Sequence, residues 1–85
     1  MARRVQAFTP VFQISPNPFT DQFHLESQES ITEIRLFNNW GALILLESTN
    51  AKSLNINIPT VSNGIYFLQV KFANGQRAIK KLIKL

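Results

Sequence analysis

The 85 residues predict a small all-β protein, an antiparallel β-sandwich of about seven short strands. Apolar and polar residues alternate with the period of a half-buried strand, and helical periodicity is weak throughout. Turn residues separate these segments at intervals of about 8–12 residues, which is typical of sandwiches. Hydrophobic residues make up 45% of the chain, enough for the core of one domain. A partly open barrel is the alternative architecture.

The first predicted strands are short and separated by polar turns. All the predicted strands, in order, are residues 11–14, 22–26, 31–38, 42–46, 54–58, 64–72 and 76–85. The first is an apolar run that Pro16 ends, and the second alternates strictly between polar and apolar residues. In the third, Ile34 and Leu36 share one face and lie opposite charged side chains.

The middle strands differ in how they are expected to be buried. Residues 42–46 are continuously apolar, which predicts a strand that is covered on both faces or lies at the centre of a sheet. Residues 54–58 show the most regular alternation of the chain. Residues 64–72 are rich in aromatic and β-branched side chains, which favour strands.

The last segment, residues 76–85, fits two kinds of element. Ile79, Leu82 and Ile83 have the spacing of an apolar helical stripe. The Asn74-Gly75 pair just before them predicts a two-residue type I′ hairpin turn, which leads into a strand. We therefore expect a strand, with Ile79, Ile83 and Leu85 on one face.

Two other segments have clear turn chemistry. Asn38 to Gly41 is predicted to be a turn, since Asn and Gly tolerate positive φ. Pro16 and Pro18 flank Asn17 and restrict the backbone, so residues 16–19, here called the strap, are predicted to be a rigid, extended entry into a strand that buries Phe19.

The charge and composition exclude several classes of protein. Nine Lys and Arg oppose five Asp and Glu, and the cations gather at the two ends of the chain. The chain has no cysteine, hence no disulfide or thiolate metal site. No segment approaches the roughly 20 apolar residues of a membrane helix. The first residues lack the apolar region of a secretory signal peptide, so we expect any such signal on a longer parent chain.

Catalytic and metal-binding chemistry is poorly supported. His24, the only histidine, lies near Asp21 and Glu26 on a predicted polar strand face, where an exposed histidine is ordinary. The two carboxylates have no cleft between them that would suit glycoside hydrolysis. A single histidine with scattered carboxylates matches no metal-ligand spacing. We therefore predict neither an enzyme nor a cofactor or metal site.

Two binding functions remain as alternatives. Trp40 and Phe37 could form a stacking platform for a carbohydrate, as in a small sugar-binding or adhesive module. Binding of nucleic acid would use the terminal cations with Phe72; those cations are Arg77, Lys80, Lys81 and Lys84. Alternating lysines on a strand are more often a solvated face that discourages edge pairing, so we do not expect nucleic acid as a partner.

Four motifs, taken in order, resemble one known family. They are Ser15-Pro16-Asn17-Pro18-Phe19-Thr20, then residues 34–43 with Gly41, then residues 54–70 with Gly64-Ile65-Tyr66, and finally Lys80-Lys81-Leu82-Ile83-Lys84-Leu85. From about Gln13 to Leu85 the chain resembles the C-terminal sorting domain of the type IX secretion system of Bacteroidetes. It departs from the family at Asn38, where an aspartate is usual, and in the loop at residues 60–63.

The resemblance implies an immunoglobulin-like sandwich that acts as an address label. Such a domain is carried at the end of an exported cargo protein and is recognised by the outer-membrane translocon. A sortase-like protease typically removes it, and the cargo is anchored at the cell surface or released. The implied location is thus the periplasm, then the outer membrane or the exterior.

This reading assigns roles to individual residues. Residues 13–85 would form the sorting domain and residues 1–12 an N-terminal extension or linker, with any cleavage site within or upstream of residues 1–14. The expected recognition residues are Lys80, Lys81, Lys84 and Leu85, through the edge and charge of the last strand. Pro16, Asn17, Pro18, Phe19, Gly41, Gly64, Ile65 and Tyr66 are expected to mark the family, with Tyr66 in the core and its hydroxyl hydrogen-bonded.

Overall fold

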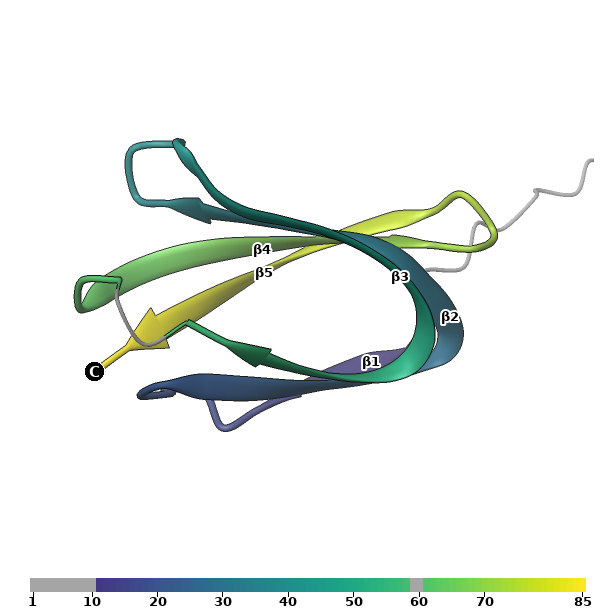
Figure 1. Cartoon of the computed structure of the whole chain (residues 1–85), viewed down its shortest axis with the longest axis horizontal. Coiled ribbons are helices and arrows are strands. Elements are labelled where there is room, and N and C mark those ends of the chain that lie inside the picture. Colours follow the sequence, from purple (N-terminus) through teal and green to yellow (C-terminus); the bar gives the residue numbers. More distant parts are fainter. Residues whose placement is uncertain (1–10, 59–60) are drawn as a thin grey trace, which may run out of the picture.

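The computed structural model describes residues 11–58 and 61–85, and all of the regular structure in these residues is β-strand (Figure 1). The strands are β1 (Phe12–Ser15), β2 (Gln22–Asn38), β3 (Leu43–Asn57), β4 (Gly64–Phe72) and β5 (Arg77–Lys84). Their pairings, β1 with β2, β2 with β3, β2 with β4 and β4 with β5, are antiparallel. The predicted all-β antiparallel fold is confirmed. Most of the predicted N-terminal extension, and Thr60 of the loop before β4, lie outside the described residues.

β2 and β3 are long strands that pass together from one layer of the sandwich to the other (Figure 1). The first half of β2 lies between β1 and the second half of β3, which makes a three-stranded layer. The second half of β2 lies between the first half of β3 and β4, and β5 completes a four-stranded layer. The sheet therefore curls over its own core instead of dividing into two separate sheets.

The number of strands differs from the prediction because two pairs of predicted strands are continuous. Residues 27–30 and 47–53 contain neither proline nor glycine, so nothing in them ends a strand. The register shifts between Glu26 and Ile31 instead, and again between Ile31 and Glu33. Such shifts bend a strand without ending it, which carries β2 and β3 around the corner.

The core lies between the two layers and follows the predicted alternation. The buried hydrophobic residues are Phe19, Phe23, Leu25, Ile31, Ile34, Leu36, Ile56, Ile58, Tyr66, Leu68, Val70, Phe72 and Leu82. Ile34 and Leu36 point inward as expected, and Tyr66 is buried and donates its hydroxyl hydrogen bond to the carbonyl of Ser62. The rings of Phe19 and Phe23 meet edge to face, 5.0 Å between centroids.

The prediction that residues 42–46 are covered on both faces or lie at the centre of a sheet is wrong. Leu43, Ile44 and Leu46 are exposed, and only Leu45 is partly buried against the core. β3 pairs with β2 alone, so it is an edge strand and one of its faces is open to solvent. A continuous apolar run does not distinguish a central strand from an edge strand with an uncovered apolar face.

Two hairpins close with three-residue loops of the same construction. In the β4–β5 hairpin, Phe72 N–H donates to the Gln76 carbonyl and Gly75 N–H donates to the Phe72 carbonyl. The β2–β3 hairpin repeats this pattern, and its glycine, Gly41, has a φ of 85°, close to the 89° of Gly75. The predicted hairpin is therefore confirmed, but its two-residue turn is wrong. A single glycine with positive φ suits the three-residue type, whereas type I′ requires two such residues.

The last segment is a strand, and Ile79, Ile83 and Leu85 alternate with the inward residues as predicted. Their side is the exposed one, however, whereas Leu82 and Lys84 point inward and are buried. Residues 11–58 and 61–85 include no helix that could cross a bilayer.

Candidate recognition surface

The strap contacts the last strand directly, through the side chain of Asn17. Its Nδ2 donates a hydrogen bond to the Lys81 carbonyl, and its Oδ1 accepts one from Ile83 N–H, each 3.1 Å long. The side-chain amide therefore pairs with β5 as a neighbouring strand would. Residues 16–18 form a bend and not the predicted extended entry, with both X–Pro bonds cis, and this bend brings Asn17 to β5.

Phe19 continues the same contact with its backbone. Its N–H donates to the Ile83 carbonyl and its carbonyl accepts from Leu85 N–H, both at 2.9 Å. Its side chain is fully buried, which confirms the predicted role of the strap in anchoring Phe19. The first and last motifs of the chain thus form one structural unit.

The strap covers the edge of β5 that the sequence suggested as a recognition edge. Its hydrogen bonds occupy outward backbone groups of Lys81, Ile83 and Leu85. Within the described residues, no strand pairs with this edge between Arg77 and Lys80. Strand addition by a partner could therefore use only that first half of β5 unless the strap were displaced.

The four predicted recognition residues do not share one face. Lys81 and Leu85 are exposed. The ammonium of Lys80 lies 5.8 Å from the centre of the Phe12 ring, a cation–π contact across the open side of the sandwich. Lys84 is only 7% exposed and lies opposite Phe19 in the bridge between the strap and β5. Lys80, Lys81 and Leu85 are thus exposed, and Lys80 differs from the other two in its contact with Phe12.

The remaining family-motif residues lie at the end of the sandwich that carries the β2–β3 turn. Asn38 Oδ1 accepts hydrogen bonds from Trp40 N–H at 2.9 Å and Ala42 N–H at 3.0 Å, which an aspartate oxygen would accept equally. Gly41 closes this turn with positive φ, and Gly64, with a φ of 143°, begins β4. The departure at Asn38 therefore preserves the turn.

The outer face of the four-stranded layer carries the surface feature that the sequence missed. Residues directly opposite one another in antiparallel strands share a face. By this register the outer face consists of Glu33, Arg35, Phe37, Leu43, Leu46, Ser48, Ile65, Phe67, Gln69, Lys71, Arg77, Ile79, Lys81 and Ile83. Its apolar end lies toward the β2–β3 turn, and its charged end toward the β4–β5 turn.

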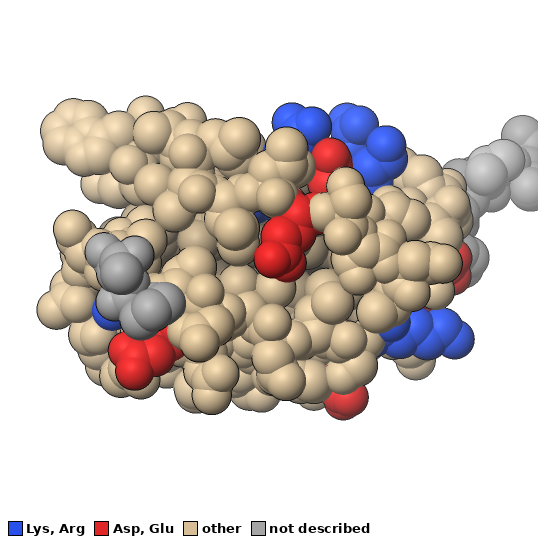
Figure 2. All heavy atoms as spheres, in the orientation of Figure 1, with Lys and Arg blue, Asp and Glu red and all other residues tan. Residues whose placement is uncertain are grey.

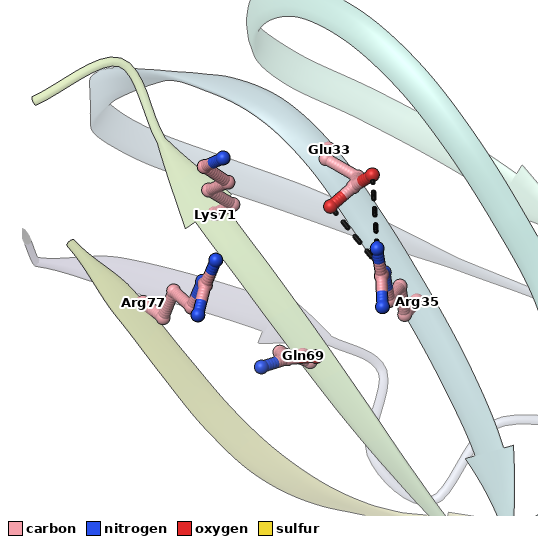
Figure 3. Close-up of a pocket in the computed structure, with 5 residues that line it drawn as sticks. All are labelled: Glu33, Arg35, Gln69, Lys71 and Arg77. Carbon is pink, nitrogen blue, oxygen red and sulfur yellow. Dashed lines mark hydrogen bonds and ion pairs between the residues drawn. The ribbon is translucent and has the colours of Figure 1, made fainter. Parts of the chain in front are cut away.

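At the charged end, five side chains surround a small hollow of about 70 Å³ (Figure 3). The Arg35 guanidinium pairs with the Glu33 carboxylate, with Nε 3.3 Å from Oε1. Lys71 and Arg77 lie directly opposite each other on β4 and β5, and among the described residues neither has a carboxylate partner. Gln69 completes the lining. The hollow is therefore bordered by three cations and one carboxylate.

His24 has more polar neighbours than the sequence indicated. Its Nδ1 lies 2.7 Å from Asn55 Oδ1, and its Nε2 lies 3.2 Å from Ser53 Oγ and 3.7 Å from Glu26 Oε2. Asp21 is not among these contacts. The group lies on an exposed strand face, and the residue pairs flanking His24 belong to the β1–β2 and β2–β3 ladders. The described residues contain no cluster of three or more metal-ligating side chains.

A second hollow, of about 280 Å³, lies between the β2–β3 turn and the loop before β4. Its lining is uncharged: Asn38, Asn39, Trp40, Ser62, Asn63, Gly64, Ile65 and Tyr66. Trp40 is 90% exposed at its margin. The predicted platform partner Phe37 lies on the outer face, as expected, opposite Phe67. It is not among the residues that line this hollow with Trp40.

Comparison with known proteins supports a family and a fold. A family described as "Secretion system C-terminal sorting domain" matches residues 13–85. No curated protein matches the sequence. Among solved structures, the chain is similar to CopC from Methylosinus trichosporium OB3b, with 14% identity and a TM-score of 0.56. That match covers 89% of this chain and 91% of the other, and at this identity it shows a shared fold alone.

The family match begins at the start of β1 and includes both the strap and the strand that it covers. The four motifs that resemble the type IX sorting domain all lie within it. The protein therefore belongs to the family of secretion-system C-terminal sorting domains.

Proposed function

We propose that the domain directs a cargo protein, attached on its N-terminal side, through the type IX outer-membrane translocon. A sortase-like protease then removes the domain, and the cargo is anchored at the cell surface or released. The domain acts as a substrate of this machinery and carries out no reaction itself. The observation that carries the proposal is the pairing of the strap with β5, because it unites the family's first and last motifs in one folded signal.

The four C-terminal residues have different proposed roles within this signal. Lys81 and Leu85 contact the receptor, since both are exposed beside the strap. Lys80 and Lys84 hold the strand in place, Lys80 over the Phe12 ring and Lys84 beneath the strap. Recognition through the side chains suits the structure better than strand addition, because the strap already occupies this part of the edge.

Export of a reporter fusion tests the proposal. The reporter carries a signal peptide at its N-terminus and this domain at its C-terminus, in a bacterium with a type IX system. Deletion of residues 79–85 is expected to leave the reporter in the periplasm. The double substitution Lys81→Glu with Leu85→Glu, which changes only exposed side chains, is expected to have the same effect without unfolding the domain.

Lys52→Glu is the matched control, because Lys52 is also exposed but lies on β3, away from β5. It should be exported normally. Normal export of both the deletion and the double variant would contradict the proposal.

A neutral saccharide is a second candidate ligand, because of the hollow beside Trp40. An exposed indole offers an apolar plane, and the uncharged amides around it offer hydrogen bonds, the combination that suits a sugar ring. Trp40 is the only tryptophan, so its fluorescence reports on this hollow alone. A saturable change on titration with neutral oligosaccharides, lost in Asn39→Ala, would support this function. Unchanged fluorescence across such sugars would rule it out.

A further inference from the structure

Exposed large hydrophobic residues are concentrated on one layer of this protein. Apart from Val11, all of them belong to the four-stranded layer or its ends; they are Trp40, Leu43, Ile44, Leu46, Ile65, Ile79, Ile83 and Leu85. Scattered exposed apolar residues are ordinary on soluble proteins, whereas a contiguous apolar surface marks an interaction site. The distribution here is not scattered.

The strand register makes the apolar end of the outer face contiguous. Leu43, Phe37 and Phe67 form one cross-strand row over β3, β2 and β4, which Lys81 completes on β5. Ile65 and Ile83 form the next row over β4 and β5. Neighbouring side chains in such rows are close enough to touch, so the surface continues across all four strands. In Figure 2 the upper left arm, which Figure 1 identifies as the β2–β3 hairpin, carries no charged atoms.

The charged end of the same face is net positive. Lys71 lies opposite Arg77 on β5 and opposite Glu33 on β2, and Glu33 is paired with Arg35, so three cations share this end with one carboxylate. Two like charges directly opposite on adjacent strands disfavour the isolated domain, and an acidic partner would compensate them. Figure 2 shows one group of basic atoms at the upper margin, beyond the apolar arm, with acidic atoms next to it.

We propose that the outer face docks on an apolar protein surface of the export machinery that presents acidic side chains to Lys71 and Arg77. This inference rests on the proposed sorting function and extends the recognised surface beyond β5. Charge complementarity selects this occupant. A second copy of the chain has the same net charge of +4, so association face to face would bring like charges together. The contact is through side chains, since the outer face presents side chains and the backbone groups of its two central strands, β2 and β4, are engaged in ladders.

Two outer-face variants of the same reporter fusion test the proposal. Neither variant changes the strap or the predicted recognition residues Lys80, Lys81, Lys84 and Leu85. Leu43→Asn with Ile79→Asn removes apolar contact without adding charge. Lys71→Glu with Arg77→Glu reverses the charged end. Each pair is expected to reduce export about tenfold or more, the effect of losing a moderate binding contribution.

Matched controls lie on the other layer. Val11→Asn changes a residue that is 60% exposed just before β1, and Lys52→Glu reverses a cation on the second half of β3. Both should be exported as the unchanged fusion is. Circular dichroism and thermal melting of the purified domains establish that every variant is folded.

The result also separates this inference from the sorting function. Normal export of both outer-face variants, with loss of export on deletion of residues 79–85, would overturn the docking face and leave the function standing. Normal export of all variants would overturn both. Sedimentation velocity tests whether a second copy of the chain occupies the outer face. Binding to anionic phosphatidylglycerol vesicles tests whether a membrane surface does. A dimer, or vesicle binding, that Ile79→Asn abolishes in the isolated domain would overturn the proposed protein partner in favour of that occupant.

Discussion

Asn17 connects parts of the chain that lie 64 and 66 residues apart, using both atoms of one side-chain amide. A primary amide is suited to this position because it donates and accepts at once, as a peptide group does. The flanking prolines have no N–H groups and limit the conformations available to the strap. The residue identified as a family marker therefore has a structural role that can be measured.

Asn17→Ala is expected to lower the free energy of unfolding by about 1–2 kcal/mol, because it removes two hydrogen bonds to the backbone of β5. Urea denaturation measures this change. Asn39→Ala is the control, since Asn39 is an exposed turn residue, and it should change stability by no more than about 0.5 kcal/mol. Equal effects of the two substitutions would contradict the role of Asn17.

Phe19→Ala is expected to be more severe, about 3–5 kcal/mol, because the ring is fully buried against Phe23. A loss of this size approaches the whole stability of many small domains. Trp40→Ala removes an aromatic ring that is exposed and should be nearly neutral. A melting temperature that falls equally in both variants would show that Phe19 is not a core residue.

For single residues, the sequence predicted which hydrophobic side chains are buried, but not which distant residues they contact. The positions of Phe19 and Tyr66 in the core followed from their type and their strand context. The contact of Asn17 with β5 did not, because nothing local specifies a partner more than 60 residues away. The inward direction of Lys84 was also missed, since charged residues are rarely buried and an outward orientation was the natural expectation.

At the scale of elements, the two three-residue hairpin loops are built in the same way. Each places one glycine in the left-handed region, Gly41 and Gly75, and no non-glycine residue in the described part of the chain has positive φ. A Cβ on either glycine would meet no atom within 4 Å. Any cost of substitution there is therefore conformational and does not arise from a clash.

Gly75→Ala is expected to destabilise the domain by about 1–2 kcal/mol, the cost of left-handed backbone for an L-residue. Gly75→Asn should lose less, because asparagine visits this region more readily. Chemical denaturation of the two variants compares them directly. An alanine variant as stable as the unchanged protein would show that the loop adopts another conformation.

The strands themselves show what periodicity can and cannot specify. Alternation placed Ile34 and Leu36 in the core, whereas β4 was identified from its aromatic and β-branched residues and β5 from the Asn74-Gly75 turn. Alternation did not show that residues 22–38 form one strand, because the alternation is interrupted at the polar residues 27–30, where the strand bends and continues. Nor could it show that the apolar start of β3 lies at an edge, because edge position depends on pairing between distant strands.

At the scale of the whole molecule, the curled sheet separates three surfaces. The three-stranded layer carries the polar group around His24, the strap covers the edge of β5, and the outer face of the four-stranded layer combines apolar and basic residues. A sorting signal needs a defined fold and an accessible surface. Both are present here, although the surface is broader than the last strand alone.

The most direct test of the sorting function is whether the domain is sufficient for export. A reporter with a signal peptide, fused to this domain, is expressed in a type IX-competent strain and in a matched strain that lacks the outer-membrane translocon. We expect the reporter at the cell surface or in the medium of the first strain only, and in the periplasm of the second. A reporter that stays in the periplasm of both strains, or leaves both equally, would contradict the account.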